Sequence, residues 1–129
     1  MTRPHVLDAS ALLAVLNQEA GAEQVLPLLS GALMSAVNWS EVVQKALARG
    51  VAVGPRLRLD VQAIGVRILP FEVGDADLTA QLWRSAPRAG LSLGDRACLA
   101  LARQRDGVAV TAHRAWAELA LDVPVKVVR

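Results

Sequence analysis

Three carboxylates hold positions where a folded chain could bring them together. Asp8 ends an apolar run, Glu41 closely follows a second, and Asp95 opens a helical pattern. Two like charges about 4 Å apart repel by roughly 4 kcal/mol at an effective dielectric near 20, so gathered acids call for a cation between them. Carboxylate oxygens suit Mg²⁺ or Mn²⁺. Such an ion activates water and stabilises charge on a phosphoryl oxygen, which is the chemistry of phosphodiester hydrolysis.

Each acid also has a purely structural interpretation. Asp8 could cap the first helix, as could Ser10, and Asn38-x-x-Glu41 fits a capping pattern at a helix start. Asp95 could complement the positive end of a helix dipole. For any one acid taken alone we favour the structural interpretation. Asp8 is the hardest to explain this way, because a charge among apolar neighbours is costly unless it is paired.

The elements that must position these acids alternate between short apolar runs and longer helical patterns. We expect strands at 5–7, 31–36, 66–71, 108–111 and 123–128. We expect helices at 10–18, 22–29, 38–49, 54–64, 75–85, 93–105 and 114–119, with Pro27 disturbing the second. Pro124 indicates an edge position for the last strand, and we expect the three tryptophans to pack in the core.

This alternation predicts an α/β fold of three layers, α/β/α, with a mostly parallel central sheet. In such folds ligands bind beyond the carboxyl ends of the strands, where the strand order reverses. The chain of 129 residues is expected to form a single domain over 1–129.

Composition excludes several classes of protein. Only 3% of the residues are aromatic, which argues against stacking of bases on an aromatic surface. No apolar run reaches 18 residues, so we expect no membrane-spanning helix. The single cysteine, Cys98, excludes an internal disulfide. Because Asp8 interrupts the N-terminal apolar run, an export signal is disfavoured and a cytoplasmic location is expected.

Positive charge is concentrated in two stretches. Residues 45–67 hold five Lys or Arg against one Asp, and residues 84–105 hold five Arg against one Asp. Such stretches could follow a phosphate backbone, although solvated helix faces are the favoured interpretation. Phosphate contacts are assigned by charge and by proximity in sequence to the acidic motifs, to Arg84, Arg88 and Arg114.

Four segments resemble the PIN-domain family, in particular the VapC-type toxins of bacterial toxin–antitoxin pairs. They are residues 6–12, 38–42, 91–100 and 110–116. The resemblance implies a PIN-like fold and a Mg²⁺- or Mn²⁺-dependent endoribonuclease acting on RNA. It also implies inhibition by a small antitoxin protein that covers the acidic cleft, and a homodimer. By position, Asp8, Glu41 and Asp95 would be the catalytic metal-site acids, supported by Ser10 and Thr111.

His113 departs from the family pattern, which usually has an acid after the Thr-Ala pair. A neutral imidazole can bind metal but shifts the preference toward Mn²⁺ or a softer ion. A protonated one would repel the cation, so activity would fall at acid pH. Alternatively, His113 faces solvent and the site works with three acids.

Two other functions stand beside the nuclease. The first is a catalytically weakened PIN-like module that binds RNA or protein, with His113 marking a lost acid. The second is a phosphatase with a nucleophilic aspartate, which would want a second acid two residues after Asp8. Ser10 stands there instead, which argues against the phosphatase hypothesis.

Overall fold

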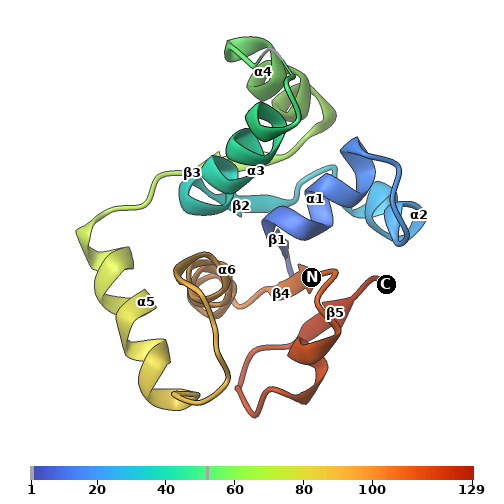
Figure 1. Cartoon of the computed structure of the whole chain (residues 1–129). Coiled ribbons are helices and arrows are strands. Elements are labelled where there is room, and N and C mark those ends of the chain that lie inside the picture. Colours follow the sequence, from blue (N-terminus) through green and yellow to red (C-terminus); the bar gives the residue numbers. More distant parts are fainter. Residues whose placement is uncertain (1, 52) are drawn as a thin grey trace.

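The five apolar segments expected to be strands pair into one sheet. In the computed structural model, which describes residues 2–51 and 53–129, the strand order is β3-β2-β1-β4-β5 and every pairing is parallel (Figure 1). The strands are β1 (His5–Leu7), β2 (Leu33–Ser35), β3 (Arg67–Leu69), β4 (Val108–Thr111) and β5 (Val125–Val127). Pro124 immediately precedes β5, which is an edge strand as expected.

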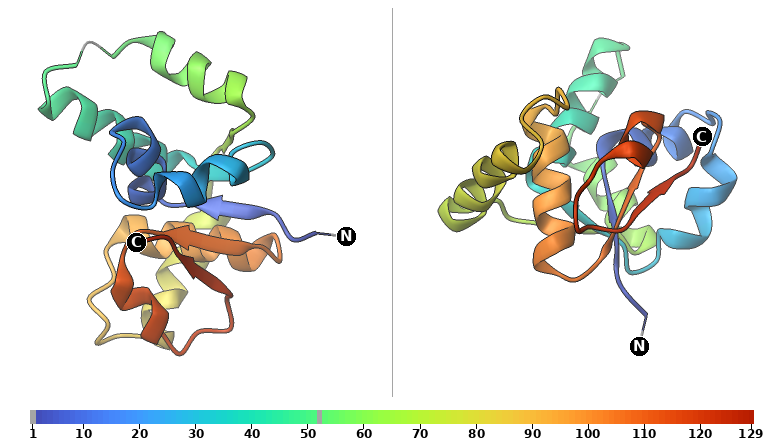
Figure 2. Two further views of the ribbon diagram at one scale, coloured as in Figure 1. Left: turned by 90° about the vertical axis from the view of Figure 1, so that its right-hand side faces the viewer. Right: turned by 90° about the horizontal axis from the view of Figure 1, so that it is seen from below.

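Helices cover both faces of this sheet and confirm the three-layer α/β/α architecture (Figure 2). Successive strand residues point to opposite faces, so Leu7 and Val110 join one buried cluster while Val6 and Ala109 join the other. The first cluster is covered by α1 (Ala9–Leu16), α2 (Ala22–Val25), α3 (Ala36–Ala48) and α4 (Pro55–Ile64). The second is covered by α5 (Val73–Ser85), α6 (Leu93–Gln104) and the 3₁₀ helix η2 (Arg114–Glu118).

Several element boundaries differ from the expected ones. The helix expected at 22–29 is α2 followed by the 3₁₀ turn η1 (Leu26–Leu28), because Pro27 has no N–H for an α-helical bond. Helix α3 begins at Ala36 rather than Asn38, because Ser35 caps it by accepting a hydrogen bond from the Val37 N–H. Glu41 therefore lies in the second turn of α3, not in the first.

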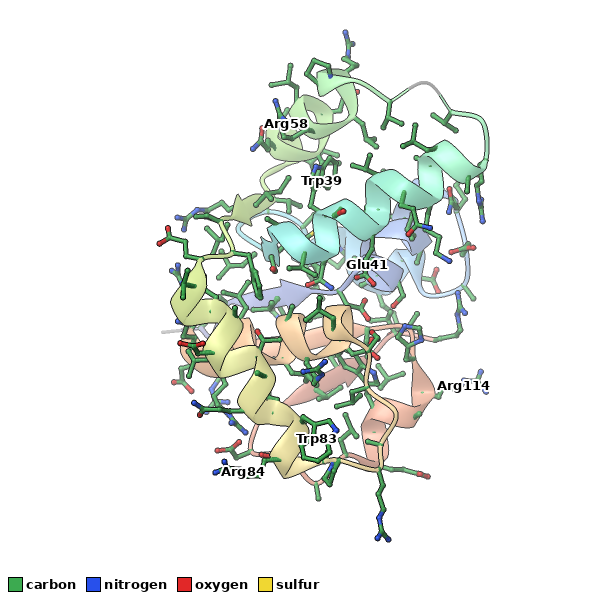
Figure 3. All side chains as sticks on the ribbon, turned by 60° about the vertical axis from the view of Figure 1, so that its left-hand side comes forward. Trp39, Glu41, Arg58, Trp83, Arg84 and Arg114 are labelled. Atoms are coloured by element: carbon green, nitrogen blue, oxygen red, sulfur yellow. The ribbon has the colours of Figure 1, made fainter. Side chains whose placement is uncertain are left out.

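The tryptophans divide between core and surface. Trp116 is buried and Trp39 packs partly against the first cluster. Trp83 is 60% exposed on α5, so its expected place in the core is wrong (Figure 3). The helical pattern around Trp83 did not distinguish the inner face of α5 from its outer face.

Strand order reverses at β1. The chain runs outward from β1 through β2 to β3, and then returns to the other side of β1 for β4 and β5. The carboxyl ends of β1 and β4 therefore lie side by side, and the Asp8 N–H donates to the Val110 carbonyl at 3.1 Å. Within the described residues, no helix is both long and apolar enough to cross a bilayer.

Candidate active site

Asp8 is a buried carboxylate fixed by three donors. Its Oδ1 accepts hydrogen bonds from the Ser10 hydroxyl at 2.7 Å and the Ala11 N–H at 2.9 Å. Its Oδ2 accepts from the Thr111 hydroxyl at 2.6 Å. The bond from Ala11 makes Asp8 the N-cap of α1, so the structural interpretation of this residue is correct. Capping alone does not require the contact with Thr111, which crosses from β4.

Burial raises the pKa of Asp8, because the charged form loses hydration. The hydrogen bonds from Thr111, Ser10 and Ala11 lower the pKa and oppose that effect, and so does the nearby charge of His113. The net direction is upward. The protein thus holds a carboxylate in one orientation without fully compensating its negative charge.

Two hydroxyls form the support beneath Asp8. The Ser10 oxygen accepts from the Ala112 N–H at 2.9 Å, and the Thr111 oxygen accepts from the His113 N–H at 3.0 Å. Each hydroxyl therefore donates to Asp8 while its own oxygen accepts from the backbone that follows β4. Ser10 and Thr111, to which the family resemblance assigns a supporting role, thus both contact the Asp8 carboxylate.

Glu41 reaches the same edge of the sheet from α3. The Asn38 side-chain amide donates to Glu41 Oε1 at 2.9 Å and to the Gly94 carbonyl at 3.0 Å. The expected capping role of Asn38 is wrong, since this residue lies inside the helix and is buried. It ties α3 to the start of α6 instead, and its Oδ1 has no hydrogen-bond partner within the described part of the chain.

Gly94 leaves room for the Glu41 carboxylate. A Cβ atom added at Gly94 would collide with both carboxylate oxygens of Glu41. Gly94 is the second residue of α6, where its conformation does not itself require glycine. The absent side chain therefore allows α6 to approach Glu41, a role that spacing in the sequence did not indicate.

Burial also raises the pKa of Glu41. The hydrogen bond from Asn38 lowers this pKa, the charges of Asp95 and Asp8 raise it, and that of His113 lowers it. All three acids are thus close enough for their charges to interact.

Asp95 stands at the start of α6. Its Oδ2 accepts from the Ser92 N–H at 3.0 Å, while its own N–H donates to the Ser92 hydroxyl at 3.1 Å. This reciprocal capping box stabilises the first turn of α6 and fixes the carboxylate at the helix N-terminus. The structural role is therefore real, and it also presents Asp95 beside Glu41.

His113 faces both the acids and the solvent. Its Nε2 lies 3.9 Å from Asp8 Oδ2, and its side chain is 55% exposed. The ring lies 6.0 Å from that of Trp116, centroid to centroid. His113 is therefore exposed to solvent, as one expectation holds, and it also lies near the acids, as metal binding would require.

One cavity joins these groups. It has a volume of about 470 Å³ and is lined by the three acids, Ser10, Ser92 and His113, and by Glu19, Lys45, Arg49 and Arg129. Its lining does not include Arg84, Arg88 or Arg114. In Figure 3, Arg84 lies well away from Glu41 at the end of α5, and Arg114 points outward from η2.

We did not assign Lys45, Arg49 or Arg129 to the site from the sequence, and the sequence signal for them differs. Lys45 and Arg49 follow Glu41 at intervals of four residues, which places all three on one helix face. That spacing was a usable signal. Arg129 comes from the other end of the chain, and no local pattern links it to the site.

A larger cavity of about 560 Å³ lies elsewhere, between the end of β3, α5 and α6. Its acids, Glu72 and Asp75, form the capping box of α5. Both carboxylates are thus engaged in local structure. We assign the chemistry to the smaller cavity because acids from three separate elements line it, the buried Asp8 and the partly exposed Glu41 and Asp95.

The donor set of the smaller cavity suits a hard divalent cation. Its carboxylate oxygens are the ligands that Mg²⁺ and Mn²⁺ prefer, and two of these acids carry raised pKa values that a cation would relieve. Across residues 2–51 and 53–129, no three His, Cys, Asp or Glu side chains already surround a common point as ligands. Mg²⁺ is usually bound through one or two carboxylates and keeps several waters.

Solved structures share this fold. A toxin–antitoxin complex from Klebsiella pneumoniae is 19% identical, with a TM-score of 0.73 over 97% of this chain and 98% of that chain. FitAcB from Neisseria gonorrhoeae is 23% identical, with a TM-score of 0.67 over 94% and 95%. DNA-bound VapBC from Salmonella typhimurium is 18% identical, with a TM-score of 0.66 over 98% of each chain.

Family membership rests on the sequence itself. A search of the curated proteins finds no match. The PIN domain family matches residues 5–121, a range that includes Asp8, Glu41, Asp95 and His113. Because the match covers nearly the whole chain and the fold agrees with it, this chain belongs to the PIN domain family.

Proposed function

We propose that this protein is a VapC-type toxin, a metal-dependent endoribonuclease that hydrolyses RNA phosphodiester bonds. The observation that carries the proposal is the convergence of Asp8, Glu41 and Asp95 on one cavity at the carboxyl edge of the sheet. Members of the PIN domain family are generally nucleases. The carboxyl edge of the sheet, at the reversal of strand order, is also where parallel α/β folds bind their ligands.

Asp8, Glu41 and Asp95 would hold a Mg²⁺ or Mn²⁺ ion. When bound, the ion supplies activation of water and stabilisation of negative charge on the phosphoryl oxygen. The chain contributes fixed orientation. Asp8 is held by its three donors, Glu41 by Asn38 and Asp95 by Ser92. These bonds form the outer support that holds ligands in place.

We further propose that the toxin is held inactive by a small antitoxin protein that covers the acidic cavity, and that it forms a homodimer in the cytoplasm. Two of the similar solved structures are described as a toxin–antitoxin complex and as VapBC bound to DNA. Native co-purification tests the antitoxin proposal. A small, tightly bound companion whose removal releases ribonuclease activity supports it, and an active protein that purifies alone contradicts it.

Cleavage of a labelled RNA tests the nuclease. We expect activity with Mg²⁺ or Mn²⁺, loss in EDTA and recovery when the ion is restored. Asp8→Asn removes the buried charge while keeping a side chain that can cap α1, so the fold should survive and activity should not. Asp77→Asn removes an exposed acid of α5 and is the matched control. Full wild-type activity in EDTA would exclude the metal mechanism.

A binding module without catalysis is the second candidate, and His113 favours it. An imidazole stands 3.9 Å from Asp8 Oδ2, near the place where the family usually has an acid. Calorimetric titration separates the two functions. A working site binds Mg²⁺ or Mn²⁺ and a weakened one binds neither.

A further inference from the structure

The acidic cavity has a positively charged side. Lys45, Arg49 and Arg129 line it together with the acids, and we call these three residues the cationic edge. Lys45 and Arg49 lie one and two turns beyond Glu41 on the same face of α3. The edge therefore begins directly beside the carboxylates and extends away from them along the helix.

Arg129 is held in the edge by the fold. The preceding residue, Val128, is fully buried, and its N–H donates to the Thr111 carbonyl at 2.9 Å. Gly21, in the turn between α1 and α2, lies so close that a Cβ there would strike the Val128 carbonyl. This contact and the positive φ of Gly21, +97°, both require glycine. The end of the described chain is thus packed beside the turn that carries Glu19.

Glu19 holds both arginines of the edge. Its Oε2 lies 3.8 Å from Arg49 Nη2 and its Oε1 lies 3.9 Å from Arg129 Nη2. The side chains are between 37% and 57% exposed, and ion pairs of such length and exposure are weak. The Glu19 carboxylate therefore forms only a weak bridge between the two guanidinium groups. A phosphate group in the same position would bind both guanidinium groups more strongly.

We propose that the cationic edge binds a phosphate group of the RNA strand next to the bond that is cleaved. In the free protein, the Glu19 carboxylate occupies the position of this phosphate group. This inference rests on the proposed function for the identity of the substrate. Three acids alone repel a polyanion, so the strand needs cations near them to approach. The edge supplies that charge within the same cavity, whereas Arg84, Arg88 and Arg114 lie outside its lining.

Binding of RNA without metal tests the edge separately from catalysis. Fluorescence anisotropy of a labelled single-stranded RNA oligonucleotide in EDTA is measured over a range of salt concentrations. The test variant is Arg49→Ala/Arg129→Ala. The matched control is Arg58→Ala/Arg67→Ala, which removes the same charge from exposed positions outside the cavity lining. Thermal melts followed by circular dichroism establish that each variant is folded.

The expected result is specific in size and direction. Each lost phosphate contact reduces the magnitude of the slope of log affinity against log salt by about 0.7 for a single strand. Because Arg49 and Arg129 share one phosphate in this proposal, the double variant should lose about 0.7. Its affinity at low salt should fall at least about tenfold, and the control should keep the wild-type slope. Glu19→Gln should bind RNA more tightly than the wild type, because it removes the competing carboxylate.

Other outcomes overturn the inference. The inference is wrong if the slope is unchanged in Arg49→Ala/Arg129→Ala or falls equally in the control. It is also wrong if Glu19→Gln binds RNA more weakly than the wild type, or if the wild type binds no RNA. Failure of the nuclease proposal is distinguishable. If the wild type cleaves nothing with metal but the variants change binding as expected, the edge stands without the reaction. If the wild type cleaves RNA and the double variant binds normally, only the edge fails.

Discussion

The Thr111 hydroxyl donates to Asp8 Oδ2 across 2.6 Å and joins two strand ends that are 103 residues apart in the sequence. Both side chains are buried. Because β1 and β4 are neighbours only through the reversal of strand order, the fold itself creates this bond. The hydroxyl also accepts from the His113 N–H, so one side chain fixes both an acid and the residue that departs from the family pattern.

Removal of this hydroxyl should impair catalysis more than folding. Thr111→Val keeps the branched shape, but it leaves Asp8 without its strand-crossing donor and the His113 N–H without its acceptor. Loss of such outer support typically costs about 10-fold to 100-fold in activity or metal affinity, and a buried group left unpaired costs about 1–3 kcal/mol of stability. RNA cleavage rates and urea unfolding measure the two effects.

The conservative variant Thr111→Ser distinguishes the hydroxyl from the shape. Serine keeps the donor and loses one methyl group, so activity should return to near the wild-type level while stability falls by about 1 kcal/mol. If Thr111→Val cleaves RNA as fast as the wild type, the hydroxyl has no positioning role.

Gly94→Ala should separate the site from the stability of the fold. The new methyl group would collide with the Glu41 carboxylate and displace it. Alanine is otherwise the better helix residue, by up to about 1 kcal/mol. We expect a strong loss of Mg²⁺ affinity and cleavage with little change in melting temperature.

Gly74→Ala is the matched control, because Gly74 is also the second residue of its helix and a Cβ there meets nothing within 4 Å. It should leave activity unchanged and stability equal or slightly higher. Equal activity in the two variants would show that the space at Gly94 does not matter to the site.

Metal-free protein should lose part of its stability as the pH rises, because burial raises the pKa values of Asp8 and Glu41. A group with a raised folded-state pKa contributes fully below its unfolded pKa, near pH 4 for carboxyls. That contribution is lost as the pH rises through the folded value. Glu41→Gln cannot ionise, so its stability relative to the wild type should improve from pH 4.5 to pH 7.

Urea unfolding in EDTA at the two pH values measures this difference. Glu118→Gln removes one exposed acid of η2 and should show a nearly constant difference from the wild type. A constant difference for Glu41→Gln as well would mean that Glu41 titrates alike in the folded and unfolded chains.

The fold was predictable because each strand carries its own apolar signal. Short runs such as His5–Leu7 stop at polar residues, and helical patterns separate them, which is sufficient for a parallel sheet between helices. The start of α3 was not predictable in the same way. Ser35 ends β2 and also caps the helix, so no loop separates the two elements, and Asn38 resembled a cap only because its tertiary partner, Gly94, was unknown.

The convergence of the candidate acids was predictable from their places at strand ends and helix starts, whereas contacts that depend on packing were not. Asp8, Glu41 and Asp95 each follow an apolar segment, and the structure brings them to one cavity. Arg84 was chosen for its proximity in sequence to the acidic motifs, but α5 packs on the outside of α6. Arg129 reaches the cavity through the pairing of β4 with β5, a relationship between distant segments that local patterns do not contain.

His113 offers the sharpest test of the metal site. As a metal ligand, the His113 imidazole near Asp8 would be softer than the acid that the family usually has and would carry one negative charge fewer. The wild type should therefore favour Mn²⁺ over Mg²⁺. In His113→Asp, Mg²⁺ affinity should rise about tenfold or more, and the ratio of Mn²⁺ to Mg²⁺ affinity should fall. Calorimetric titration of both ions measures each change.

His113→Asn is the control, since it removes the imidazole without adding charge. It should weaken Mn²⁺ binding and should not reproduce the gain in Mg²⁺ affinity. Before metal is added, His113→Asp should also be less stable than His113→Asn, because a further carboxylate near Asp8 adds repulsion that only a cation relieves. If the Mn²⁺ to Mg²⁺ ratio is the same in all three proteins, His113 does not contact the ion, and the site works with three acids alone.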